Sequence, residues 1–558
     1  MAMRRIGSLA GALVMALCAS PAWAQVTVLS AERIDTMDLA HPRAEAMAFD
    51  ASGRILALGG REALLRAHPG ATRVDLGSAT VIPGLIDAHG HMAGLGMSHL
   101  TADLVGTSSK AEILARLQAF AAGLPADAWL VGRGWDQNDW PETAFPTAAD
   151  LDAAFPDRPV WLSRIDGHAG WANSAAMRAV GRDLAGDWQP DGGRIVRDAG
   201  GRATGVFVDG AMGLVDAVVP AADDAAIERQ LKLAMDDAVA HGLTGVHDAG
   251  VSLREMRVYQ RLADRGELPM RITAMADGDS EALAWLCREG TYQHPSHRLK
   301  MRTVKLYVDG ALGSRGAARL RDYSDDHGNL GLLLMTPAQA QDVDARARDC
   351  GVQVATHAIG DRGNRVVLDA YAKALGEAAT RGDHRWRIEH AQVLAPEDLP
   401  RLAALHVIAS MQPTHATSDM PWAEERLGPE RIQGAYAWRK LRDSGARLAL
   451  GSDFPVESVD PRLGLYAAAT RTDAQGMPRG GWHPEDKLTA YEALRGFTLD
   501  AAYAGFAETE VGSLAPGKRA DFVVLAQDPL AIDPAGLRNL TVRSTWVDGK
   551  PVYQAPSD

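Results

Sequence analysis

One stretch of this 558-residue chain decides its fold: Val81-Ile82-Pro83-Gly84-Leu85-Ile86-Asp87-Ala88-His89-Gly90-His91. The apolar part, Val81 to Ala88, predicts a buried strand, and two histidines follow it directly. Side chains two positions apart in extended backbone point to the same side, so His89 and His91 can bind one metal ion. Taken alone, the pair could equally be incidental polar residues at a strand end.

Seven more segments of the same apolar kind follow, and amphipathic helical patterns separate them. This alternation predicts a parallel α/β architecture, and eight strands over this length predict a (β/α)8 TIM barrel. The seven segments are Thr244 to His247, Arg271 to Ala276, Thr303 to Val308, Val352 to Thr356, Trp386 to Glu389, Val407 to Met411 and Leu448 to Gly451.

Residue types that bind metals recur at or near the ends of these strands. Lys305 lies inside an apolar strand, where a lone ammonium group would be costly to bury. His357 and His390 each end a strand, and Asp453 follows the last one. Because strand ends of a barrel gather on one face, where active sites lie, these residues favour a metal site with His89 and His91.

The pattern of apolar, strand-forming and turn-forming residues divides the chain into four parts. Residues 1–24 read as a signal peptide, since Arg4 and Arg5 precede an apolar run and Ala22-Trp23-Ala24 gives a cleavage site after Ala24. Short strands and turns predict one small composite β-sandwich from residues 25–80 and 512–558. Residues 81–511 form the barrel, and about 105–205 are expected as an insertion that serves as a lid over its mouth.

Composition and the first segment exclude several classes of function. The net charge of -13 leaves no basic stripe, so nucleic acid is not an expected partner. The apolar run of the signal is too short to span a bilayer, and Leu17 argues against a lipid anchor, so we expect a periplasmic or secreted protein without membrane anchoring. Of the two mature cysteines, Cys287 and Cys350, we expect buried free thiols, although export would permit a disulfide.

Longer motifs make the assignment more specific. Besides the opening stretch, the chain contains Asp309-Gly310-Ala311-Leu312-Gly313-Ser314-Arg315-Gly316, Thr356-His357-Ala358-Ile359-Gly360-Asp361, Gly451-Ser452-Asp453-Phe454-Pro455-Val456 and Gly512-Ser513-Leu514-Ala515-Pro516-Gly517-Lys518-Arg519-Ala520-Asp521. With these motifs the chain resembles the amidohydrolase superfamily, and more closely its Amidohydrolase-3 branch with N-substituted formamide deformylases. The resemblance covers nearly the whole mature chain.

The resemblance implies a distorted TIM barrel and a hydrolase with a divalent metal, usually zinc, with two ions per chain. His89 and His91 would bind one ion and His357 and His390 the second. Asp453 would bind metal and move protons. Lys305 matches a bridging carboxylated lysine; the alternative is an unmodified lysine paired with Asp309 or another acid.

The function that this ligand set favours is hydrolysis of a C–N bond in an amide, an N-substituted formamide or a cyclic amide by a metal-activated hydroxide. A deaminase or imidazolonepropionase-like activity, an esterase or lactonase activity, and a non-catalytic binding protein remain alternatives. The substrate is a small molecule, and homo-oligomers are left open.

Four further residues are candidate substrate contacts. His168 lies in the insertion, where a residue at a helix start is the competing interpretation. His247 ends the second strand, where a hydrogen-bonded structural histidine is the competing interpretation. Trp135 and Trp482 carry aromatic rings that would line a pocket for apolar groups, although ordinary packing explains them as well.

Overall fold

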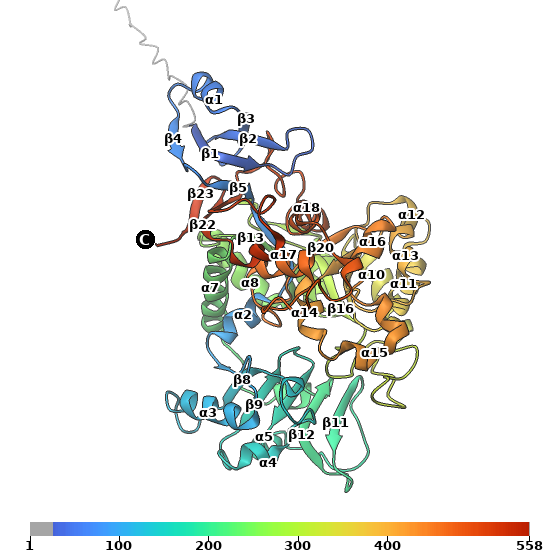
Figure 1. The fold of residues 1–558 in the computed structure, drawn as a ribbon. Coiled ribbons are helices and arrows are strands. Elements are labelled where there is room, and N and C mark those ends of the chain that lie inside the picture. The colour runs from blue at the N-terminus through green and yellow to red at the C-terminus, as the bar shows by residue number, and fades with distance from the viewer. Residues whose placement is uncertain (1–25, 557–558) are drawn as a thin grey trace, which may run out of the picture.

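The central architecture is a barrel of eight parallel strands. The computed structural model describes residues 26–556, so the predicted signal peptide lies outside the described residues. Hydrogen bonding follows the order β6 (Leu85–Gly90), β13 (Leu243–Val251), β14 (Arg271–Asp277), β16 (Leu299–Tyr307), β17 (Gln353–Ala358), β18 (Arg387–His390), β19 (Ile408–Met411) and β20 (Leu448–Leu450). A parallel bridge between Gly90 and Phe454 joins the last strand's end to the first. The predicted (β/α)8 barrel is confirmed (Figure 1).

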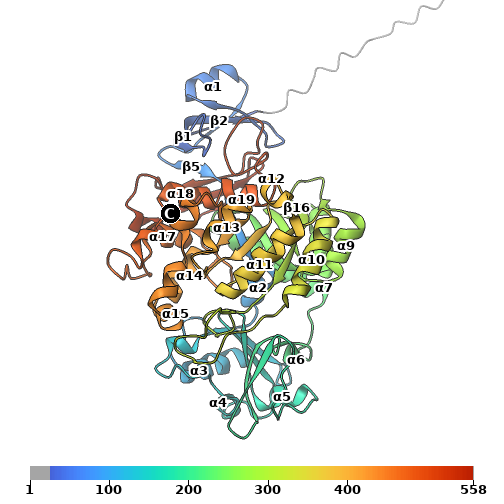
Figure 2. The ribbon, with the colours of Figure 1, turned by 90° about the vertical axis from the view of Figure 1, so that its right-hand side faces the viewer.

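Helices surround the barrel strands on the outside (Figures 1 and 2). Several begin at reciprocal caps. Ser252 and Glu255 exchange hydrogen bonds at the start of α8 (Leu253–Asp264), and Thr336 and Gln339 do so at the start of α10 (Pro337–Asp349). Among residues 26–556, no helix is long and apolar enough to cross a membrane. The larger barrel helices are α7 (Asp224–Ala240), α8 (Leu253–Asp264), α9 (Glu281–Glu289), α10 (Pro337–Asp349), α11 (Asp361–Leu375) and α17 (Pro461–Thr470).

Strands from both ends of the described chain form one sheet, which lies above the barrel in Figure 1. Its path is β23 (Lys550–Gln554), β22 (Val542–Val547), β21 (Phe522–Leu525), β5 (Thr80–Pro83), β1 (Thr27–Asp35), β2 (Arg43–Phe49) and β3 (Ile55–Gly59), with β4 (Thr72–Asp75) beside β1. The prediction of a single strand from Val81 to Ala88 is therefore wrong. The segment forms two strands, β5 and β6, which separate at Gly84, where a Cβ atom would lie 2.1 Å from Oγ1 of Thr244.

The insertion between β6 and β13 is a small domain with its own core, not only a lid. We call residues 102–209 the inserted domain; it lies at the bottom of Figure 1. Inside it, the ring centroids of Trp135 and Trp171 lie 5.9 Å apart, and Trp140 packs against both. Its sheet runs β11 (Gly193–Arg197), β12 (Ala203–Asp209), β10 (Ala169–Ala172), β9 (Val160–Arg164), β8 (Leu130–Trp135) and β7 (Ala102–Asp103).

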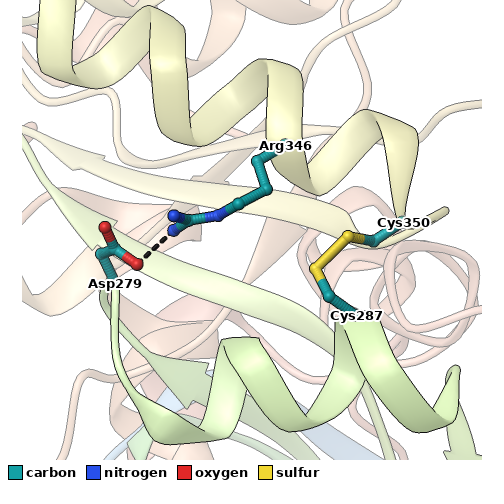
Figure 3. Close-up of a disulfide and its surroundings, with 4 residues drawn as sticks. All are labelled: Asp279, Cys287, Arg346 and Cys350. Carbon is teal, nitrogen blue, oxygen red and sulfur yellow. Dashed lines mark hydrogen bonds and ion pairs between the residues drawn. A yellow bond between two sulfur atoms is a disulfide. The ribbon is translucent and has the colours of Figure 1, made fainter.

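Cys287 and Cys350 form a disulfide, which corrects the expectation of two free thiols (Figure 3). Cys287 lies in α9 and Cys350 caps α10. The two helices follow adjacent strands, β14 and β16, and therefore run side by side, although the cysteines are 63 positions apart. An ion pair between Arg346 in α10 and Asp279, just before α9, joins the same two segments (Figure 3).

Candidate metal centre

The barrel mouth opens into a cavity of about 790 Å³ that the barrel and the inserted domain line together. Most of the predicted site residues face it, and His89 lies beneath, fully buried. The predicted residues that line the cavity are His91, His168, Lys305, His357, His390 and Asp453.

The first candidate ligand group consists of His89, His91 and Asp453. Oδ1 of Asp453 lies 3.4 Å from Nε2 of His89 and 3.2 Å from Nε2 of His91. The other ring nitrogen of each histidine has an acceptor: Oε2 of Glu389 at 2.5 Å from His89 Nδ1, and the Ala249 carbonyl at 2.9 Å from His91 Nδ1. Because both partners accept, Nδ1 carries the proton and Nε2 keeps its lone pair for a metal.

A second candidate group consists of His390, His415 and Asp453. Nδ1 of His390 lies 2.8 Å from Oε1 of Gln412, so Nε2 of His390 is again free to bind metal. Neither group includes His357, but its ring centroid lies 4.5 Å from that of His390. Nε2 of His357 is buried and has no hydrogen-bond partner among residues 26–556, as expected of an atom that binds a metal ion.

His415 is a site residue that the sequence prediction missed. Its Nε2 lies 3.3 Å from Oδ2 of Asp453 and its Nδ1 3.2 Å from Oε1 of Glu457. Burial alone would lower the pKa of His415, but these two carboxylates raise it to about 10. With both nitrogens protonated, His415 holds Asp453 in place and is a poor metal ligand, although its atoms lie near the second group. The run Gln412-Pro413-Thr414-His415 after a predicted strand was the available signal.

Protonation states in the cluster suit a cation. Burial lowers the pKa of His89 to about 4 and holds the pKa values of His357 and His390 well below the usual range. Burial alone would raise the pKa of Asp453, but the hydrogen bond from His415 and the neighbouring imidazoles hold it well below its usual range. Neutral imidazoles around a carboxylate are the forms that bind divalent metals, so these residues fit such an ion.

Lys305 lies within the same cluster. Its Nζ atom is 3.1 Å from Nε2 of His89, and in residues 26–556 no carboxylate oxygen lies within 4.0 Å of it. Asp309 is not its partner, because that carboxylate accepts hydrogen bonds from the backbone N–H groups of Ile359 and Gly360. Burial lowers the pKa of Lys305 to about 8.

A buried polar chain lies behind the metal-facing histidines. Arg387 donates to Glu389 through Nε at 2.5 Å and to Nδ1 of His247 through Nη1 at 2.8 Å. His247 lines a separate cavity of about 160 Å³ among residues at the amino-terminal ends of the barrel strands. His247 therefore does not face the mouth cavity where a substrate contact was expected, and the hydrogen bond from Arg387 agrees with the structural interpretation.

The two tryptophans are also packing residues rather than pocket residues. Trp135 is fully buried in the inserted domain. Trp482 packs its ring 5.5 Å from that of Tyr436, and its backbone carbonyl accepts from Arg471. Neither ring lines the mouth cavity, because Trp135 packs in the core of the inserted domain and Trp482 in the core of the barrel.

Polar side chains of the inserted domain, rather than tryptophan rings, line the cavity. His168 lines it, with Nδ1 2.6 Å from Oδ1 of Asp209. Arg133 donates through Nη2 to the Ile165 carbonyl at 2.7 Å and through Nη1 to the Pro455 carbonyl, two residues after Asp453. Arg133 therefore joins the inserted domain to the loop that carries Asp453.

Comparisons with known proteins agree with this geometry. Residues 72–553 match the sequence profile of the Amidohydrolase family. The chain is 35% identical over 497 residues to the protein YtcJ of Bacillus subtilis, covering 87% of this chain and 91% of that protein. It is 30% identical over 542 residues to the N-substituted formamide deformylase of Arthrobacter pascens, covering 93% and 97%. An uncharacterized metal-dependent hydrolase from Pyrococcus horikoshii has a similar structure, with a TM-score of 0.74, 27% identity and coverage of 91% and 99%.

Proposed function

The chain belongs to the amidohydrolase family, and from that premise we propose that it is an exported, metal-dependent enzyme that hydrolyses the C–N bond of an amide, an N-substituted formamide or a cyclic amide. One observation carries the proposal: His89, His91 and His390 each bind an acceptor through Nδ1 and point Nε2 into one cluster with Asp453. A family relative named for N-substituted formamides supports the substrate class.

The donor set allows two ions, and we propose zinc. His89, His91 and Asp453 would hold one, and His357 with His390 the other. A carbamate on Lys305 would be a ligand between them, since Nζ already lies beside His89 without an acidic partner within 4.0 Å among the described residues. A bound divalent ion lowers the pKa of water and polarises a carbonyl group, which is the chemistry that hydrolysis needs.

Asp453 is proposed as the group that moves the proton. Its Oδ1 faces the imidazoles of His89 and His91, and its Oδ2 is held by His415. A carboxylate kept ionised in this way can accept a proton from the attacking water and deliver it to the leaving nitrogen. His415, itself fixed by Glu457, would prevent Asp453 from rotating away from that position.

Export is proposed from the first 24 residues and is supported by the disulfide. Disulfides form and persist in oxidising compartments such as the bacterial periplasm. The net charge of -13 is compatible with a protein that handles small molecules rather than nucleic acid.

The deciding experiment combines metal analysis with a substrate panel. The purified chain is assayed for bound metals and then tested on N-substituted formamides, N-acyl amino acids, cyclic imides, a lactone and an ester, with and without a chelator. Close to two ions per chain and chelator-sensitive cleavage of an amide would support the proposal. One ion per chain with deamination, or no turnover of any compound by the metal-loaded chain, would contradict it.

A further inference from the structure

A second cavity lies at the amino-terminal ends of the barrel strands, and we call it the amino-terminal cavity. It has a volume of about 160 Å³ and shares no lining residue with the mouth cavity. His247 of β13 and Lys300 of β16 lie in its wall, and α19 (Leu499–Ala504) and the segment after it close one side. Gln293 and Thr509, which also line it, are exposed, so the cavity reaches the surface.

Lys300 brings a positive charge to this cavity without an acidic partner. Its Nζ atom donates to the Gly505 carbonyl, and no carboxylate of residues 26–556 pairs with it. An ammonium group has three N–H donors, so donors remain for a ligand. Burial lowers the pKa of Lys300 to about 7, so the group is charged at pH 6. Because a cation loses solvation when it leaves bulk water, a bound anion would offset the cost of placing it here.

His247 places a neutral donor beside Lys300. Nδ1 of His247 lies 2.8 Å from Nη1 of Arg387, and a guanidinium group can only donate. Nδ1 is therefore the acceptor, and the ring proton lies on Nε2. A Cβ atom at Gly505 would lie 2.5 Å from Nε2, and the carbonyl of Gly505 accepts from Lys300. Two donors, one of them charged, thus lie on either side of one residue of the cavity wall.

The two acidic residues in the wall have arginine partners. Asp521 accepts from Arg271 through Nε at 2.6 Å and Nη2 at 2.8 Å. Oε2 of Glu510 accepts from Nε of Arg519 at 3.1 Å. Since each carboxylate is compensated by a guanidinium group, the charge of Lys300 is the one left without a partner in the lining.

We propose that the amino-terminal cavity binds a short monocarboxylate, whose oxygens accept from Nζ of Lys300 and Nε2 of His247. Its alkyl chain would pack against apolar side chains that form much of the remaining wall, among them Ile86 and Val511. A carboxylate matches the two donors with two acceptor oxygens and Lys300 with one negative charge. No covalent bond changes in this contact. The inference goes beyond the proposed hydrolysis and does not depend on it, because the two cavities share no residue.

Butyrate and butyramide form a matched pair of ligands that differ in charge. Calorimetry on the metal-containing chain at pH 6 measures both affinities. We expect butyrate to bind at least about tenfold more tightly than butyramide, because hydrogen bonds to charged groups are the stronger ones.

Two substitutions assign the binding to this cavity. We expect Lys300→Met to lower butyrate affinity about 10- to 100-fold, since it removes the charged donor. His247→Asn keeps an acceptor for Arg387 and removes Nε2, and we expect a loss of about three- to tenfold. Any binding of butyrate to metal at the barrel mouth is common to all the variants and leaves these differences unchanged.

Lys518→Met is the matched control. Lys518 also donates to a backbone carbonyl, that of Val511, but does not line the cavity, so we expect wild-type affinity. Crystals grown with 4-bromobutyrate locate the ligand by the anomalous signal of bromine, which decides the site if Lys300→Met does not fold. Equal butyrate affinity in wild type and Lys300→Met, equal affinities for butyrate and butyramide, or bromine signal at the barrel mouth alone would overturn the inference.

Discussion

Nδ1 of His89 lies 2.5 Å from Oε2 of Glu389, and both side chains are fully buried. Arg387 donates to the same carboxylate through Nε and Nη2. Burial alone would raise the pKa of Glu389, but Arg387 and His89 hold it well below its usual range. The negative charge on Glu389 therefore increases the electron density at Nε2 of His89, the atom that faces the metal cluster.

Glu389→Gln should weaken metal binding. The substitution keeps the shape of the side chain but removes the charge behind His89, and loss of such a partner typically costs 10- to 100-fold in metal affinity. Titration with a chelator of known affinity measures the change. Glu397→Gln serves as the control because Glu397 is exposed and lies outside the cavity; equal affinities in the two variants would refute the role of Glu389.

Asp453→Asn should retain metal and lose most turnover. The amide can still lie beside His91 and His415 but cannot take up a proton from water. We expect kcat to fall about 100- to 10,000-fold, in line with the usual contribution of general acid–base catalysis. Metal analysis and steady-state kinetics on the same preparation make the test, and near-normal kcat would rule out proton transfer by Asp453.

Loss of the disulfide should destabilise the barrel without changing its chemistry. Cys287→Ser with Cys350→Ser frees a loop of 63 positions, for which about 2–4 kcal/mol of stability is typical. Urea denaturation of the oxidised, reduced and substituted chains measures the difference. Arg346→Gln removes the neighbouring ion pair alone, and we expect a change below about 1 kcal/mol because that pair is exposed. An unchanged urea midpoint after reduction would contradict the expected stabilisation.

Asp344 should make the folded state less stable as pH rises. Burial raises the pKa of Asp344 to about 8, and its Oδ1 has no hydrogen-bond partner within the described part of the chain. The unfolded chain releases this proton near pH 4 and the folded chain only near pH 8, so the folded state binds more protons in that window and its stability falls as pH rises.

Asp344→Asn removes this dependence. We expect the variant to gain about 1–3 kcal/mol over the wild type at pH 8 and little at pH 4, measured by thermal and urea denaturation. Asp342→Asn lies on the exposed face of the same helix and should show no such difference between the two pH values. Parallel stability curves for wild type and Asp344→Asn would disprove the account.

The sequence predicted the barrel and most of the cluster because their signals are local. An apolar strand followed by a polar residue is visible in a short window, as at His89, His357 and His390. Lys305 stood out because a charged residue interrupts an apolar strand. Of the predicted residues that do not line the cavity, His89 lies beneath it, whereas Trp135, His247 and Trp482 lack such a position at the mouth end of a barrel strand.

Contacts between distant segments could not be predicted in this way. The disulfide depends on α9 and α10 being neighbours, and the bond between Asp209 and His168 depends on the sheet order of the inserted domain. His415 was within reach of the sequence, since it follows the strand ending at Met411, but its partner Glu457 lies on another loop. A single sequence does not indicate which loops lie in contact in the folded chain.

Closure of the barrel joins its first strand to its last. Asp87 beside His89 accepts from the Ser452 hydroxyl at 2.7 Å, across 365 positions of sequence. His89 and Asp453 are consequently brought together only when the ring of strands is complete. On the proposed export, a chain that crosses the membrane unfolded would bind its ion only in the compartment where the barrel closes, and the metals available there would determine which ion it holds.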